Sequence, residues 1–394
     1  MNNIDSFRSR FFELSAFVIL FILLTHPGFP QKLTGEPVTG NRHSIHSSAL
    51  GEERSFSISL PSSYGETSQS YPLLLILDGN DFFPFMAATV RYYGNVGIIP
   101  EMIVAGVDSR DRWHDFTPTR ADIPDGTPLP TSGGAESFSR FIREELMPDV
   151  ESNYRAAPFR VLYGHSVGGL FVINSLLSQP DDFSGYIATS PSMWWDNELM
   201  TKEILQKREN NPAAEKYLFI TMGNEGGTML DPVLNFTAAL KKAQPANVNW
   251  EFRQFEKADH LTMPFKAFPY ALEFIFSDWQ LPAETLQKGL HAVAAHYKNL
   301  SEKYGYHVQV PEAVLNGIGY REMNKGNMEA ALEAFRMNAE NYPESANVYD
   351  SIGEFYLKNG NREKAIDNYR RSLELNPQNA NALKVLKQLE SGAR

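Results

Sequence analysis

The stretch VLYGHSVGGL (161–170) contains a serine whose neighbours suit nucleophilic chemistry. Ser166 follows an apolar run and lies between Gly164 and Gly168, two residues from each. A serine hydroxyl is a weak nucleophile that needs an adjacent base. A tight strand-to-helix turn would project it toward a substrate but crowds the backbone, so glycines on both sides are expected. The pattern G-x-S-x-G also arises by chance, but here a strand pattern precedes it and a helix pattern follows it, which favours a nucleophilic Ser166.

A base and an acid should follow such a serine, in the chain order serine, acid, histidine. His260 comes just after the predicted strand 248–256 and is the only histidine between Ser166 and the predicted helical segment 281–305. Glu225 directly follows the predicted strand 216–224, and Asp231 comes six residues later. We interpret Asp231 as the N-cap of the next helix, because its side chain can accept from free backbone N–H groups. The sequence therefore predicts His260 as base and Glu225 as acid, with Asp231 in reserve.

Two backbone amides are candidates for an oxyanion hole. One is the N–H of Val167, the residue after the nucleophile, at the start of a predicted helix. The other should come from a loop after an earlier strand, and LLLILDGNDF ends its apolar run in Asp78-Gly79-Asn80. We expect the N–H groups of Asn80 and Val167 to stabilise a developing oxyanion.

The elements that must position these residues alternate along the chain. Strand patterns lie at 55–61, 71–79, 101–108, 159–166, 184–192, 216–224 and 248–256, and helical patterns at 135–154, 168–179, 231–243 and 264–279. Continuous apolar runs suit strands buried on both faces, and alternation with helices predicts a mostly parallel sheet flanked by helices. The stretch 109–134 is rich in Pro, Gly and Asp and is expected to be a long loop that is either functional or disordered.

Several segments, in order, resemble one known family. HSSALGEERSFSISLPSSY, YPLLLILDGNDFF, IVAGVDSRDRWHDFTP, YGHSVGGL, SPSMWWDN and the late His260 are similar to the "Putative esterase" family of α/β-hydrolases. That family includes enterochelin-type siderophore esterases, S-formylglutathione hydrolases and feruloyl or acetyl-xylan esterases. The resemblance covers about residues 43–280 and implies an α/β-hydrolase fold with Ser166 as nucleophile, His260 as base and an LDG-type oxyanion loop. Some siderophore-esterase relatives use a weakened or missing acid, so the choice between Glu225 and Asp231 stays open.

The family-like segments also contain candidate pocket residues. We expect the substrate pocket to be shaped by Arg112, Asp115, His165, Trp194 and Trp195. The alternative is that Arg112 and Asp115 pair within the long loop and that the tryptophans belong to the core. The H-x-x-H of His43 and His46 lacks a third ligand, so no metal site is expected. The implied chemistry requires no cofactor.

The C-terminal part contains an internal repeat. Gly319, Gly326, Ala331, Phe335 and Pro343 recur 34 residues later as Gly353, Gly360, Ala365, Tyr369 and Pro377. This period and pattern resemble the tetratricopeptide repeat, a helix-turn-helix unit. The small residues would let the two helices of each unit approach closely, and residues 381–390 are expected to form a capping helix. Such repeats commonly bind peptides, so a protein partner is possible, and they occur in some exported relatives.

The N-terminal segment and the composition indicate location and partners. Arg8 and Arg10 precede an apolar run from Leu14 to Leu24, which suits a secretory signal better than a membrane span. We expect an exported protein, periplasmic or extracellular, unless the segment stays as an uncleaved membrane anchor. A net charge of −11 argues against a nucleic-acid partner, and the absence of cysteine excludes disulfides and thiol catalysis.

These observations predict four parts. Residues 1–30 form the signal or anchor, 40–280 an α/β-hydrolase esterase domain, 281–310 a helical linker and 311–394 the repeats. The expected function is hydrolysis of carboxylic esters through an acyl-enzyme. Two alternatives remain: an interaction protein in which the repeats bind a partner and the hydrolase domain is secondary, and an acyltransferase that uses the same triad.

Overall fold

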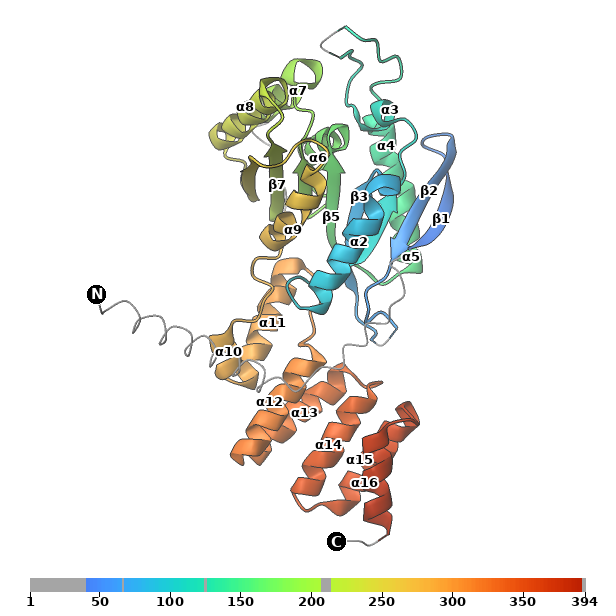
Figure 1. Cartoon of the computed structure of the whole chain (residues 1–394), viewed down its shortest axis with the longest axis vertical. Coiled ribbons are helices and arrows are strands. Elements are labelled where there is room, and N and C mark those ends of the chain that lie inside the picture. The colour runs from blue at the N-terminus through green and yellow to red at the C-terminus, as the bar shows by residue number, and fades with distance from the viewer. Residues whose placement is uncertain (1–39, 66, 124–125, 207–213, 392–394) are drawn as a thin grey trace, which may run out of the picture. The chain divides into compact units, whose positions relative to one another are not determined.

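An eight-stranded, mostly parallel sheet is built from the apolar runs (Figure 1). The computed structural model describes residues 40–65, 67–123, 126–206 and 214–391, so the predicted signal or anchor at 1–30 lies outside the described residues. The sheet order is β1-β2-β4-β3-β5-β6-β7-β8, and only β2 runs antiparallel to the other strands. The strands are β1 (Asn41–Ser47), β2 (Glu52–Ser59), β3 (Tyr71–Leu77), β4 (Ile103–Val107), β5 (Ala156–His165), β6 (Gly185–Thr189), β7 (Lys216–Gly223) and β8 (Val248–Phe255). The predicted α/β-hydrolase architecture is confirmed.

Helices cover both faces of the sheet, which is why the central strands read as continuous apolar runs. Every residue of β3, β4, β6 and β7 is buried. On one face, Tyr163 of β5 contacts Phe268 of α9 and Phe82 of α2 edge-on. The other face packs against the helices from α4 to α8. The helices are α2 (Gly79–Asn95), α3 (Arg112–Phe116), α4 (Ala135–Phe141), the π-helical turn η1 (Ile142–Leu146), α5 (Met147–Asn153), α6 (Val167–Ser178), α7 (Trp195–Gln206), α8 (Gly227–Ala243) and α9 (Met263–Ile275).

The strand order places one switch point at the centre of the sheet. The chain passes from β3 to β4 on one side and later returns to β5 on the other side of β3. The connections that leave the carboxyl ends of β3 and β5 therefore diverge, and sites in open α/β sheets form at such points. The predicted oxyanion loop follows β3 and Ser166 follows β5, so the topology brings these two segments to one edge.

Several elements differ from the sequence prediction. The strand β1 and the helices α2, α3 and α7 were not predicted, and α3 lies inside the stretch expected to be loop. The helix α8 begins at Gly227, with Gly226 as its N-cap residue. Asp231 is therefore an exposed residue inside the helix, and its interpretation as an N-cap is wrong. Its carboxylate folds back over Gly227, where an added Cβ would meet it at 2.9 Å.

The C-terminal helices repeat a close contact. They are α10 (Ala283–Gln287), α11 (Leu290–Tyr304), α12 (Glu312–Lys325), α13 (Met328–Asn341), α14 (Ala346–Lys358), α15 (Arg362–Leu375) and α16 (Ala380–Glu390). A Cβ on Gly319 would lie 2.5 Å from the ring of Phe335, and one on Gly353 would lie 3.0 Å from the ring of Tyr369. The 34-residue period thus matches a glycine on one helix with an aromatic ring on the next. In the described part of the chain, no helix is long and apolar enough to cross a membrane.

Candidate active site

Ser166 lies on a strained turn between β5 and α6. Its φ of 60° and ψ of −118° are rare for a residue with a side chain, and such a conformation costs on the order of 1–3 kcal/mol. Main-chain hydrogen bonds hold the turn: the N–H of Ser166 donates to Thr189 at 3.0 Å, and its carbonyl accepts from Ser192 at 3.0 Å. Gly164 is essential to this packing, because a Cβ there would lie 2.2 Å from the carbonyl oxygen of Gly168. The structure therefore maintains strain at the predicted nucleophile.

His260 and Glu225 lie together at the carboxyl ends of β8 and β7. Nδ1 of His260 is 2.5 Å from Oε2 of Glu225. Parallel pairing of Gly223 with Phe255 brings the ends of the two strands level, so the loops that follow them meet. A carboxylate only accepts, so Nδ1 donates and Nε2 is left as the basic nitrogen, the arrangement that a general base needs. The structure thus brings together two of the sequence-predicted residues, and it does not bring the exposed Asp231 into this contact.

The Glu225 carboxylate receives further hydrogen bonds. Its Oε1 accepts from the hydroxyl of Ser190 at 2.5 Å and from the N–H of Gly223 at 3.1 Å. Burial alone would raise the pKa of Glu225, but the hydrogen bonds from His260, Ser190 and Gly223 outweigh it and hold this pKa below its usual value. The sequence does not indicate this role of Ser190, because its position next to Glu225 depends on the pairing of β6 with β7 and no local motif marks it.

The predicted oxyanion loop lies beside the nucleophile turn. Asp78 has a φ of 53° and precedes α2, which begins at Gly79. The first N–H groups of a helix have no partner within it, so the amides of Asn80 in α2 and Val167 in α6 are both free of intrahelical bonds. A Cβ on Gly168 would be 3.5 Å from Oδ2 of Asp78, which shows how near the two segments are.

Asp78, which sequence reasoning did not single out, anchors this loop. Its Oδ1 accepts from Ser109 at 2.5 Å and from Nε of Arg112 at 2.9 Å. Burial raises the pKa of Asp78, against the charge of Arg112 and the hydrogen bond from Ser109, which both lower it. Arg112 also donates to the main-chain carbonyl of His165 at 3.1 Å. Arg112 therefore connects the end of β3 to the residue that precedes Ser166.

The predicted pocket residues separate into two groups. Arg112 and Trp194 are partly exposed, and Nε1 of Trp194 contacts Sδ of Met229 at 3.1 Å. Asp115, Trp195 and His165 are all buried in the structure. They have partners inside the protein.

Those partners explain the burial. Asp115 does not pair with Arg112 but makes two hydrogen bonds with Arg54, at 2.6 and 2.8 Å, in a fully buried ion pair. Nε1 of Trp195 donates to Thr119 at 3.1 Å. These contacts secure the segment after β4 to β2 and to α7.

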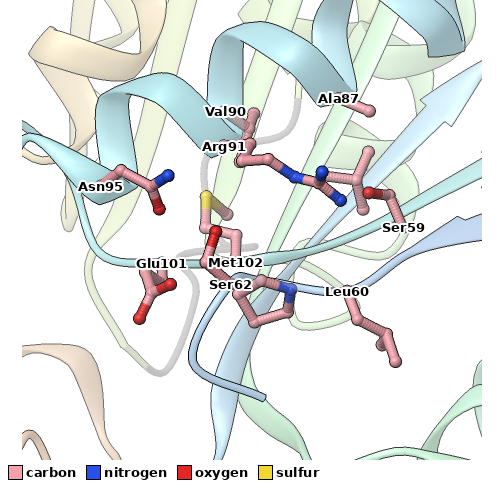
Figure 2. A pocket seen from close by; sticks show the side chains of 11 residues that line it. Ser59, Leu60, Ser62, Ala87, Val90, Arg91, Asn95, Glu101 and Met102 are labelled. Atoms are coloured by element: carbon pink, nitrogen blue, oxygen red, sulfur yellow. The ribbon is translucent and has the colours of Figure 1, made fainter. Parts of the chain in front are cut away.

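A small cavity lies at the opposite edge of the sheet (Figure 2). It is lined by the end of β2, the second half of α2 and the residues that enter β4, including Ser59, Arg91 and Glu101. These segments lie at the amino ends of the parallel strands, whereas Ser166 and His260 follow carboxyl ends. The cavity is therefore separate from the candidate active site. Within the described ranges, no three His, Asp or Glu side chains gather to hold a metal ion.

Fold and site together define an α/β-hydrolase with a serine nucleophile turn. The family described as "Putative esterase" matches residues 47–267, more than half of the chain, so the protein belongs to this family. The family described as "Tetratricopeptide repeat" matches residues 346–379, which contain α14 and α15.

Curated relatives share the hydrolase part. The chain is 39% identical to "Ferri-bacillibactin esterase BesA" of Bacillus subtilis over 163 residues, 36% of this chain and 56% of the relative. It is 34% identical to "Siderophore enterobactin esterase" of Emericella nidulans over 168 residues, 37% of this chain and 55% of the relative. The chain thus spans about half the length of these curated relatives.

A solved structure extends the likeness. An "IroE-like serine hydrolase" from Shewanella oneidensis superposes with a TM-score of 0.67 and 25% identity, covering 76% of this chain and 99% of its own.

Proposed function

We propose that the protein hydrolyses carboxylic esters through an acyl-enzyme. One observation carries the proposal: the strained Ser166 lies at the same sheet edge as a histidine whose Nδ1 is held 2.5 Å from a buried carboxylate. Enzymes that carry out nucleophilic acyl transfer place a serine on a strained turn after a central strand and orient an imidazole as its base.

Each step uses a residue of this site. Oγ of Ser166 attacks the carbonyl carbon while Nε2 of His260 takes its proton, and the amides of Asn80 and Val167 stabilise the oxyanion. His260 returns the proton to the departing alcohol oxygen, leaving Ser166 acylated. Water then loses a proton to His260 and attacks the acyl carbon. The bond from this carbon to Oγ breaks, His260 returns the proton to Oγ of Ser166, and the acyl group leaves as a carboxylic acid. Glu225 keeps its charge and stabilises the imidazolium that forms in both steps.

The proposed substrates are siderophore esters. The support comes from the relatives, of which one is a ferri-bacillibactin esterase and another is a siderophore enterobactin esterase. We also propose that the protein is exported, on the basis of the basic and apolar N-terminal sequence. A protein partner for the repeats remains part of the proposal, since tetratricopeptide units stack helices into extended binding surfaces.

The test compares two serine variants on two substrates. Ser166→Ala should abolish turnover of p-nitrophenyl butyrate and of enterobactin, and should prevent labelling by a fluorophosphonate. Ser178→Ala is the matched control, because Ser178 is exposed at the far end of α6 and bonds only to its own helix in the structure. Undiminished turnover by Ser166→Ala would refute the proposed function. Turnover of the butyrate with enterobactin left intact would refute the substrate class alone.

A further inference from the structure

His165 is the last residue of β5 and immediately precedes Ser166. The residue is buried, with 6% of its surface exposed. With so little of the residue open to solvent, the contacts of its imidazole are with other parts of the protein.

The imidazole of His165 contacts the residue that we assign as the base. Its Nε2 lies 2.9 Å from the main-chain carbonyl oxygen of His260, 95 residues later in the chain. A carbonyl only accepts, so this nitrogen carries the proton and donates. Burial, and the neighbouring His260, lower the pKa of His165 to about 3. The imidazole thus stays neutral, and the hydrogen bond persists, at any pH at which esters are assayed.

A second contact joins the same two residues. The ring centroids of His165 and His260 are 4.5 Å apart, with 44° between the ring planes. On another side, the ring of Phe82 contacts His165 edge-on at 5.6 Å. The ring of His165 is thereby confined between α2 and the loop that carries the base.

This support matters because His260 lies in an irregular segment. The strand β8 ends at Phe255 and α9 begins only at Met263. The carbonyl of Ala258 accepts a hydrogen bond from the N–H of Asn224, and Oδ1 of Asp259 accepts one from the N–H of Thr262. These bonds hold the loop on either side of the base. Glu225 orients the ring of His260 through Nδ1. The bond from His165 holds the main chain of His260 itself.

We propose that His165 is a positioning residue, whose N–H holds the carbonyl of His260 and so keeps the base aligned with Ser166. This role rests on the proposed function, since it assigns His260 as the base. His165 is itself fixed, because its carbonyl accepts from Arg112. Because His165 and Ser166 are adjacent at the end of β5, the hydrogen bond from His165 links the main chain of the base to that of the nucleophile.

The test uses three substitutions at this position. His165→Phe keeps a ring but removes the donor, and His165→Asn is too short to reach the carbonyl. His165→Gln places an amide N–H at about the reach of Nε2. We expect kcat for p-nitrophenyl butyrate to fall roughly 10- to 100-fold in the Phe and Asn variants, with KM within about two-fold, because misplacement of a catalytic group acts on the chemical step. The Gln variant should recover most of the loss.

A double-mutant cycle separates positioning from a merely structural role. If His165 and Glu225 both act by aligning His260, the loss in His165→Phe/Glu225→Gln should be smaller than the product of the single losses. His46→Phe is the control, since His46 is a largely exposed histidine of β1 paired with Glu53. Its kcat should equal that of the unaltered protein.

Three results would overturn the proposal: kcat of His165→Phe within two-fold of the unaltered protein, losses that multiply fully in the cycle, or a rise in KM alone. If circular dichroism shows that the Phe variant is unfolded, the Asn variant decides by the same criteria. Retained turnover in Ser166→Ala would instead indicate that the proposed function has failed.

Discussion

The two glycines around Ser166 are expected to respond very differently to the same substitution. Both glycines belong to the G-x-S-x-G motif, but their steric surroundings in the structure differ. A Cβ on Gly164 would lie 2.2 Å from the carbonyl oxygen and 2.4 Å from the carbonyl carbon of Gly168. A Cβ on Gly168 would meet its nearest neighbour, Oδ2 of Asp78, at 3.5 Å, an ordinary contact. Gly164→Ala and Gly168→Ala thus form a matched pair within one turn.

The magnitude follows from the displacement that each methyl group requires. At Gly164 the backbone of α6 must move by more than about 1 Å to reach van der Waals separation, and overpacking of this kind costs about 1–3 kcal/mol and sometimes more. Because Leu77 and Asp78 lie against the same turn, this movement also displaces the oxyanion loop from Ser166. At Gly168, within α6, alanine should change the unfolding free energy by less, since helical alanine is favoured over glycine by roughly 0.5–1 kcal/mol.

The assay is urea unfolding together with turnover of p-nitrophenyl butyrate. Gly164→Ala should lower the unfolding free energy by at least about 2 kcal/mol and reduce kcat strongly, whereas Gly168→Ala should stay within about 1 kcal/mol. Equal stability and equal turnover of the two variants would refute the claim that only Gly164 is sterically required.

Three further predictions concern the acid, the buried histidine and the repeats. Glu225→Gln should lower kcat by orders of magnitude while Asp231→Asn leaves it nearly unchanged, because of these two acids Glu225 is the one that contacts the base; a loss of kcat in Asp231→Asn alone would reverse this choice. The pKa of His165 is depressed to about 3 in the folded protein from an ordinary value of about 6.5, so the unfolded chain binds a proton that the native site excludes. The neutral His165 therefore contributes fully to the free energy of unfolding above pH 6.5. As the pH falls toward 3, this contribution is lost at up to about 1.4 kcal/mol per pH unit. Urea titrations at several pH values should show this dependence of the unfolding free energy on pH in the unaltered protein and a weaker one in His165→Gln. Gly319→Ala should lower the melting temperature because its Cβ would lie 2.5 Å from a Phe ring, while Gly317→Ala, with nothing within 4 Å, should not; equal melting temperatures would contradict the close helix contact.

The sequence determined the parts of this protein whose causes are local. Strands that are covered on both faces must be apolar throughout, so the central strands were predicted nearly to their ends. A serine between glycines after such a strand predicts a tight turn, and the structure shows Ser166 there with a positive φ. The order of acid and histidine after neighbouring parallel strands predicts nearby side chains, because parallel strands end at one edge. The 34-residue period likewise reflects a contact repeated within each helical pair.

Only the tertiary structure decided which side chains meet and which are buried. The register of β7 on β8 brings Glu225 to His260, whereas α8 begins four residues before Asp231 and leaves that residue exposed in the helix. Asp115 joined a buried Arg from β2, a partner 61 residues away that no spacing rule identifies. His165 turned inward to the carbonyl of the base rather than outward to a pocket. These outcomes depend on how distant segments fit within a close-packed interior, and the periodicity of a single chain does not contain that information.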